Sequence, residues 1–127
     1  MTTLATSEHI AFVATADPPR AEQFYRSVLG LQFVADEPFA LVFRLRGTML
    51  RIAKVQHFTP APFTVLGWIV PDIAAAVRGL RHKGVTFERY PGLAQDDLGV
   101  CTFPHGAKVA WFKDPDGNTL SLTEFAP

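Results

Sequence analysis

The chain has 127 residues, of which 48% are hydrophobic, so it can bury the core of one folded domain and is not disordered. Lys and Arg number 12 and Asp and Glu also number 12, so there is no positive excess and we expect no nucleic-acid partner. There is no charged-then-apolar leader and no apolar run long enough to cross a bilayer, so we expect a cytoplasmic protein without a membrane partner.

The first half of the chain predicts a strand, a helix and three more strands. An apolar strand at residues 9–14 is followed by Asp17, a good N-cap, and by Pro18, whose missing N–H costs nothing at the first helical position. The apolar residues that follow fall on one helical face: Ala21, Phe24, Tyr25, Val28 and Leu29. Gly30 predicts the end of this helix. Short strands are expected after it at residues 31–35, 40–45 and 48–55.

The second half predicts the same order of elements. A strand at residues 63–70 precedes Asp72, which is expected to cap a second helix that ends at Gly84. The apolar face of this helix comprises Ile73, Ala76, Val77 and Leu80. Further strands are expected near residues 86–90, 99–103, 107–113 and 119–125. A tight turn at residues 114–118 is expected to use Gly117 and Asn118 for positive φ, and residues 91–98 suggest a longer loop.

The two halves are copies of one module. The segment that starts at Asp72 repeats the segment that starts at Asp17, and residues 116–122 repeat residues 46–52. We therefore predict one domain, residues 1–127, with module one at 7–57, a linker at 58–62 and module two at 63–126. Because helical spacing occurs only twice and strands dominate, we predict an α+β fold with mostly antiparallel sheet.

Three motifs resemble the vicinal oxygen chelate superfamily, which includes glyoxalase I, extradiol dioxygenases and bleomycin-resistance proteins. They are His9-Ile10-Ala11-Phe12, the run from Phe24 to Leu31, and Trp111-Phe112-Lys113-Asp114-Pro115-Asp116-Gly117-Asn118. The resemblance covers nearly the whole chain. It implies two tandem βαβββ modules, each rolled into a half-open sheet around a shared cavity, and it implies a homodimer.

The resemblance also implies four matched cavity positions, on the first and last strand of each module, which hold a divalent metal in the metal-dependent relatives. Here these positions fall on His9, on Thr64 or Val65, on Arg51 and on Ser121. Arginine cannot ligate a metal, because its guanidinium stays protonated. Since His9 is the one intact position, we expect no metal and no other cofactor. If these positions are misassigned, Glu124 is the reserve ligand and a divalent metal is the expected cofactor.

The lost ligands suggest a different use for the cavity. Arg51 and Ser121 replace carboxylates, so the cavity is expected to accept a small anionic molecule, and His9 could add a hydrogen bond or act as an acid or base. Four rings are expected around this ligand: Phe12, Trp68, Phe103 and Trp111. The alternatives are that His9 is an ordinary strand histidine and that Arg51 lies on the surface or pairs with an acidic residue.

Three functions remain open from the sequence. The favoured one is a metal-free protein that binds a small anionic or aromatic molecule, as in the bleomycin-resistance branch of the superfamily. The second is a metal-dependent lyase or dioxygenase of the same superfamily, or a metal-independent enzyme that uses His9. The third is a dimeric domain with a vestigial cavity. The sequence leaves open whether the protein is an enzyme.

Overall fold

The computed structural model describes residues 3–127, and the chain divides into two compact units between Thr59 and Pro60. Each unit contains a four-stranded sheet, with strand orders β1-β4-β3-β2 in unit one and β5-β8-β7-β6 in unit two. In each sheet one neighbouring pair is parallel and the others are antiparallel. The predicted α+β fold with two repeated modules is confirmed.

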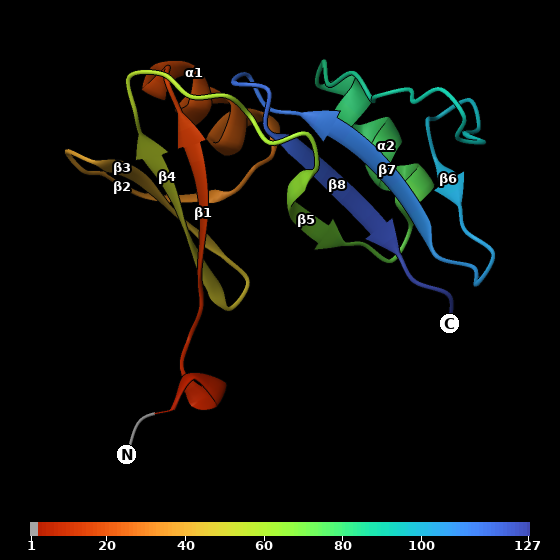
Figure 1. Cartoon of the computed structure of the whole chain (residues 1–127), viewed down its shortest axis with the longest axis horizontal. Helices are drawn as coiled ribbons and strands as arrows, with labels where there is room; N and C mark the ends of the chain where they lie inside the picture. The colour runs from red at the N-terminus through yellow and green to blue at the C-terminus, as the bar shows by residue number, and fades with distance from the viewer. Residues whose placement is uncertain (1–2) are drawn as a thin grey trace. The chain divides into compact units, whose positions relative to one another are not determined.

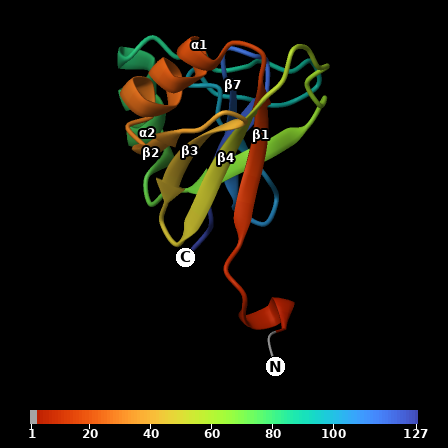
Figure 2. The ribbon, with the colours of Figure 1, turned by 90° about the vertical axis from the view of Figure 1, so that its left-hand side faces the viewer.

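The strands and the helix of unit one follow the predicted order, after a short turn near the N-terminus that was not predicted; Figure 2 shows this unit. The elements of unit one are, in chain order, the 3-10 turn η1 (Leu4–Thr6), β1 (Ile10–Thr15), α1 (Pro18–Gln23), the π-helical turn η2 (Phe24–Val28), β2 (Gln32–Asp36), β3 (Ala40–Leu45) and β4 (Thr48–Lys54). Asp17 caps α1 as expected, since its Oδ1 accepts a hydrogen bond of 3.3 Å from the backbone N–H of Arg20.

The first helix differs from the prediction of one continuous helix up to Gly30. It changes at Phe24 into a π turn, in which the Leu29 N–H donates to the Phe24 carbonyl at 2.9 Å. The adjacent rings of Phe24 and Tyr25 are both buried at this turn, and the Tyr25 ring lies 6.0 Å from that of Phe43 in the sheet. Gly30 then reverses the chain with φ of 72°.

The core of unit one lies between this helical segment and one face of the sheet. Strand β4 is central, with β1 parallel to it on one side and β3 antiparallel on the other. Leu50 and Ile52 are fully buried and pair with Phe43 and Leu41, so these side chains face the helix. Arg51, between them, points to the opposite face because side chains alternate along a strand.

Unit two repeats the arrangement around β8. Its elements are β5 (Thr64–Ile69), α2 (Ile73–His82), β6 (Cys101–Thr102), β7 (Lys108–Lys113) and β8 (Thr119–Glu124). Helix α2 packs on β7 and β8 (Figure 1). Asp72 caps α2, since its Oδ1 accepts from the Ala75 N–H at 3.1 Å. Within residues 3–127, no helix is long and apolar enough to cross a membrane.

Two predicted strands of module two are shorter than expected. The strand predicted at residues 86–90 is reduced to one bridge between Phe87 and Phe112, and the one at 99–103 to Cys101–Thr102. In the segment 86–90 the Gln95 side chain accepts from the Tyr90 N–H at 2.8 Å and donates to the Glu88 carbonyl at 2.9 Å. These backbone groups are therefore occupied by a side chain instead of a neighbouring strand.

The predicted turn at residues 114–118 forms, but Asn118 does not have the positive φ that was expected of it. Among the described residues only glycines have positive φ, and Gly117 supplies it here at 91°. Asn118 acts through its side chain, whose Nδ2 donates to Asp114 Oδ2 at 2.8 Å. Asp114 Oδ1 also accepts from the N–H groups of Asp116 and Asn118 at 2.9 Å. Asp114 and Asn118 are each 5% exposed, so the motif satisfies its own buried polar groups.

A close approach across sheet two gives a test of the register. A Cβ added at Gly67 would lie 2.7 Å from Ser121 Oγ, and the Gly67 backbone does not have positive φ. We expect Gly67→Ala to lower the free energy of unfolding by about 1 kcal/mol, because Ser121 must leave its rotamer. In a Ser121→Ala background the same change should cost less, because only the Ser121 backbone oxygen, 3.3 Å from the added Cβ, remains as a close contact. Chemical denaturation measures both, and equal costs in the two backgrounds would contradict the close approach of Gly67 to Ser121.

Candidate functional site

The strand register places Arg51 and Ser121 at matched positions on the helix-free face of each sheet, which we define as the face opposite the helix of that unit. Arg51 of β4 lies between Phe12 of β1 and Val42 of β3. Ser121 of β8 lies between Gly67 of β5 and Trp111 of β7. The two central strands therefore present different chemistry at the same place in the repeat: a cation in sheet one and a hydroxyl in sheet two.

Arg51 is paired within unit one. Its Nη2 donates to Glu37 Oε1 at 2.9 Å, and the two side chains are 29% and 46% exposed. A partly exposed pair of this kind contributes at most about 1 kcal/mol to stability. Because a guanidinium has five N–H donors, the pair leaves donors for a ligand, although an anion would have to share Arg51 with the Glu37 carboxylate.

The first-strand positions differ between the two units. His9 precedes β1 and is exposed, and the paired strand begins at Ile10, opposite Met49. Alternation places Ile10 and Phe12 on the helix-free face with Arg51, whereas an extended His9 would continue the other face. In sheet two, Thr64 pairs with Thr119 and a register shift before Leu66 leaves Val65 as an inserted residue.

Glu124, the reserve ligand, lies on the helix side of sheet two. Its Oε1 accepts from the backbone N–H of Ile73 at 2.9 Å, at the first residue of α2, and Lys108 Nζ lies 3.9 Å from its Oε2. An anionic side chain stabilises a helix N-terminus because the unpaired N–H groups there carry partial positive charge. Glu124 therefore stabilises α2 and lies on the face opposite Ser121.

The residues at the matched positions do not fit a divalent cation. These positions offer one exposed histidine that precedes β1 (His9), an arginine (Arg51), a serine (Ser121) and either a hydroxyl or an apolar side chain (Thr64 or Val65). One imidazole is no set of converging carboxylate or imidazole ligands. In the part of the chain that the structure describes, no group of three or more His, Cys, Asp or Glu could hold a metal ion.

The rings expected around a ligand are divided between the two faces. Phe12 is 60% exposed on the helix-free face of sheet one, and Trp111 is half-buried on that of sheet two. Trp68 lies on the helix side, where its ring stacks on Phe112 at 6.5 Å. Phe103 lies beside His105 at 6.2 Å, after β6. The structure therefore brings Phe12 to Arg51 and Trp111 to Ser121.

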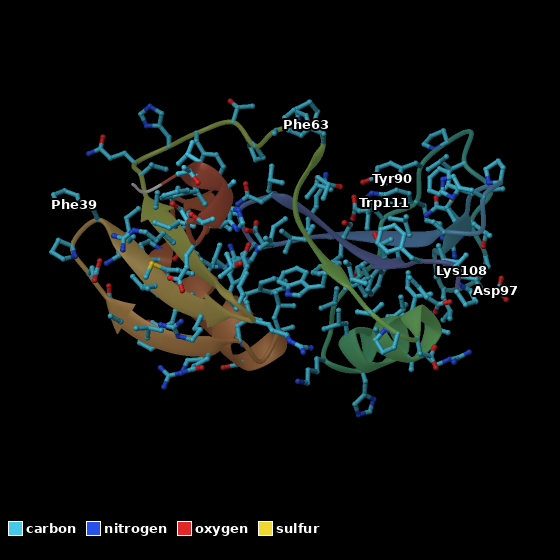
Figure 3. The ribbon with its side chains drawn as sticks, turned by 90° about the horizontal axis from the view of Figure 1, so that it is seen from below. Phe39, Phe63, Tyr90, Asp97, Lys108 and Trp111 are labelled. Atoms are coloured by element: carbon cyan, nitrogen blue, oxygen red, sulfur yellow. The ribbon has the colours of Figure 1, made fainter. Side chains whose placement is uncertain are left out.

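Tyr90 is a site residue that the sequence pattern did not indicate. Its ring meets that of Trp111 edge to face, at 5.5 Å and 78°, and the two lie side by side in Figure 3. Burial raises the pKa of Tyr90, and the Glu88 carboxylate raises it further, so the phenol stays protonated at neutral pH and can donate a hydrogen bond. The hydrogen bond from the Tyr90 N–H to Gln95 holds this residue, and no local spacing in the sequence encodes that contact.

Solved structures with the same fold cover nearly the whole chain. They include a lactoylglutathione lyase from Agrobacterium tumefaciens (19% identity, 94% of this chain and 93% of that one, TM-score 0.73). A glyoxalase/bleomycin resistance protein/dioxygenase superfamily member from Sphaerobacter thermophilus DSM 20745 is 26% identical, with 94% and 97% coverage and a TM-score of 0.71. A similar protein from Alicyclobacillus acidocaldarius is 16% identical, with 96% and 93% coverage and a TM-score of 0.70.

A search of the curated proteins finds no match to the sequence. The model of the Glyoxalase/Bleomycin resistance protein/Dioxygenase superfamily matches residues 6–122. Together with the repeated modules and the Asp114–Asn118 turn, this match shows that the chain belongs to the glyoxalase/bleomycin resistance protein/dioxygenase superfamily.

Proposed function

We propose that the protein binds a small anionic or aromatic molecule on the helix-free faces of its sheets and does so without a bound divalent metal. The observation that carries this proposal is the strand register, which puts Arg51 and Ser121 at the matched central positions. A cation at one of them opposes a metal ion and attracts an anion. Trp111 and Tyr90 add an aromatic surface with a phenol donor on sheet two.

The two faces offer different contacts. On sheet one, Arg51 and the exposed Phe12 ring would hold an anionic group and an apolar body, in competition with Glu37. On sheet two, the half-buried Trp111 would stack on a planar ligand, while Ser121 is only 7% exposed and contributes to the floor of the face. Each face can therefore be tested by substitutions within its own unit.

Metal content tests the metal-free part of the proposal. The untagged protein should be measured by elemental mass spectrometry as purified, and again after soaking in Ni, Mn, Fe and Zn salts followed by desalting. We expect no retained metal, because serine and arginine do not replace the lost ligands. Near-stoichiometric metal after desalting would contradict the proposal and favour a metal-dependent lyase or dioxygenase.

Ligand charge tests the role of Arg51. We expect benzoate to bind better than the uncharged benzamide in calorimetric titrations, and Arg51→Ala to weaken benzoate binding about tenfold through loss of a charge-assisted hydrogen bond. Glu37→Gln should strengthen it, because the guanidinium loses its competing carboxylate. Arg46→Ala, an exposed arginine in the β3–β4 turn, is the matched control.

The chain's two tryptophans provide a control within the same titration, since they lie on opposite faces of sheet two. Ligand-induced change in tryptophan fluorescence should persist in Trp68→Phe and be lost in Trp111→Phe. Unchanged benzoate affinity in Arg51→Ala, together with an unchanged fluorescence response in Trp111→Phe, would refute binding on either face.

We further propose a homodimer, supported by the apolar edge of sheet two. Strand β5 is at an edge of this sheet, and Ile69 at its end and Phe63 just before it are 75% and 65% exposed. We expect a dimer in sedimentation velocity, and Ile69→Glu should shift it towards monomer because the carboxylate opposes apolar burial. Phe125→Glu, at a residue 59% exposed after β8, is the control, and a monomeric wild-type protein would contradict the proposal.

A further inference from the structure

Unit two contains a groove that is separate from the helix-free face. It has a volume of about 380 Å³, within the range of small-molecule sites. It is lined by the end of α2, by the segment that follows it and by the loop before β6: Arg81, Gly84, Val85, Thr86, Phe87, Arg89, Asp97, Leu98 and Gly99. Asp97 lies at the outer edge of the unit, apart from Tyr90 and Trp111 (Figure 3).

The groove combines two cations with an apolar floor. Arg81 and Arg89 come from different segments, and within residues 3–127 neither forms an ion pair with a carboxylate. Arg89 Nη1 donates to the Gln95 carbonyl at 3.4 Å, which leaves its other donors available. Val85 and Phe87 are 8% and 9% exposed and supply apolar surface.

One opposing charge and one opposing dipole limit what can bind. Asp97 contributes a carboxylate to the lining, so two guanidinium groups and one carboxylate give the groove one net positive charge. The carboxyl end of α2, which ends at His82, carries partial negative charge from its unpaired carbonyls. An anion in this groove must therefore be held by the two guanidinium side chains and not by the helix.

The walls of the groove are fixed by hydrogen bonds. Gln95 Nε2 donates to the Gly99 carbonyl at 2.8 Å in addition to its contacts at residues 88 and 90. Asp96 Oδ1 accepts from the N–H groups of Leu98 and Val100, both at 2.9 Å. Gly84 and Gly99 have φ of 94° and 85°, so they turn the chain without adding side chains to the lining. A ligand therefore meets a pre-formed site.

We propose that this groove binds a small organic anion, with a carboxylate or phosphate group between Arg81 and Arg89 and an apolar body on Val85 and Phe87. A guanidinium binds a carboxylate and a phosphate in the same way, through paired N–H donors. The proposal therefore applies to both kinds of anion. The proposal is independent of ligand binding on the helix-free faces, since none of its residues belongs to them.

The test is a titration of the ¹⁵N-labelled full chain with phenyl phosphate and, separately, with benzoate, followed by ¹H–¹⁵N correlation spectra. We expect saturable shifts at residues 84–89 and 97–99, and no comparable response to phenol. Arg81→Gln and Arg89→Gln should each weaken the binding about tenfold. Asp97→Asn should strengthen it several-fold, a gain that misfolding cannot produce.

Arg78→Gln is the matched control, because Arg78 is an exposed arginine one turn earlier on α2 and does not line the groove. Its affinity for the probes should equal that of the wild type. If Arg78→Gln and Arg81→Gln weakened binding of the probes equally, the binding would depend only on the number of positive charges in unit two. That result would overturn the proposal. Shifts confined to residues near Arg51 or Trp111, or no saturable shift with either probe, would also overturn it.

Discussion

The alternation of side chains along the two central strands is the constraint on which the rest of this molecule depends. Leu50 and Ile52 must face the helical segment of unit one to form its core, so Arg51 must face away. In β8 the same requirement directs Leu120 and Leu122 towards α2 and Ser121 to the opposite face. A shift of β4 by one residue would bury the Arg51 guanidinium in the core. The free-energy cost of burying that charge excludes the shifted register.

The repeat preserves this backbone pairing while the side chains on it have diverged. Phe12 in unit one corresponds to Gly67 in unit two, and Val42 corresponds to Trp111, as judged from their pairing with Arg51 and Ser121. One helix-free face therefore carries an ion pair beside an exposed ring, and the other carries an aromatic pair above a hydroxyl. Among the described residues, neither face brings together three or more His, Cys, Asp or Glu side chains that could hold a metal ion.

In unit two, one side chain orders both candidate ligand surfaces. Gln95 binds the backbone at Tyr90, which holds the ring that meets Trp111 on the helix-free face. It also binds the carbonyl of Gly99, which lines the groove beside Arg81 and Arg89. A side-chain amide can replace strand pairing in this way. Its carbonyl oxygen accepts from a backbone N–H, and its NH₂ group donates to backbone carbonyls, as a neighbouring strand would do.

Much of the fold could be predicted from local signals. The Asp17 and Asp72 caps, the apolar periodicity of the strands and the glycine turns each act within a few residues, so the sequence by itself determined two copies of one module and their element order. The π turn at Phe24, the side-chain role of Asn118 and the replacement of a strand by Gln95 needed the structure.

The candidate site divides in the same way. The residue types at the matched positions could be read from the repeat, and the absence of a metal stays a prediction. The partners of these side chains could not be inferred. The Arg51–Glu37 ion pair, the Glu124 contact with α2 and the opposite faces of Trp68 and Trp111 are made between segments far apart in the chain. Only the tertiary structure decided them, because one residue of strand register or one loop contact reverses the face on which a side chain lies.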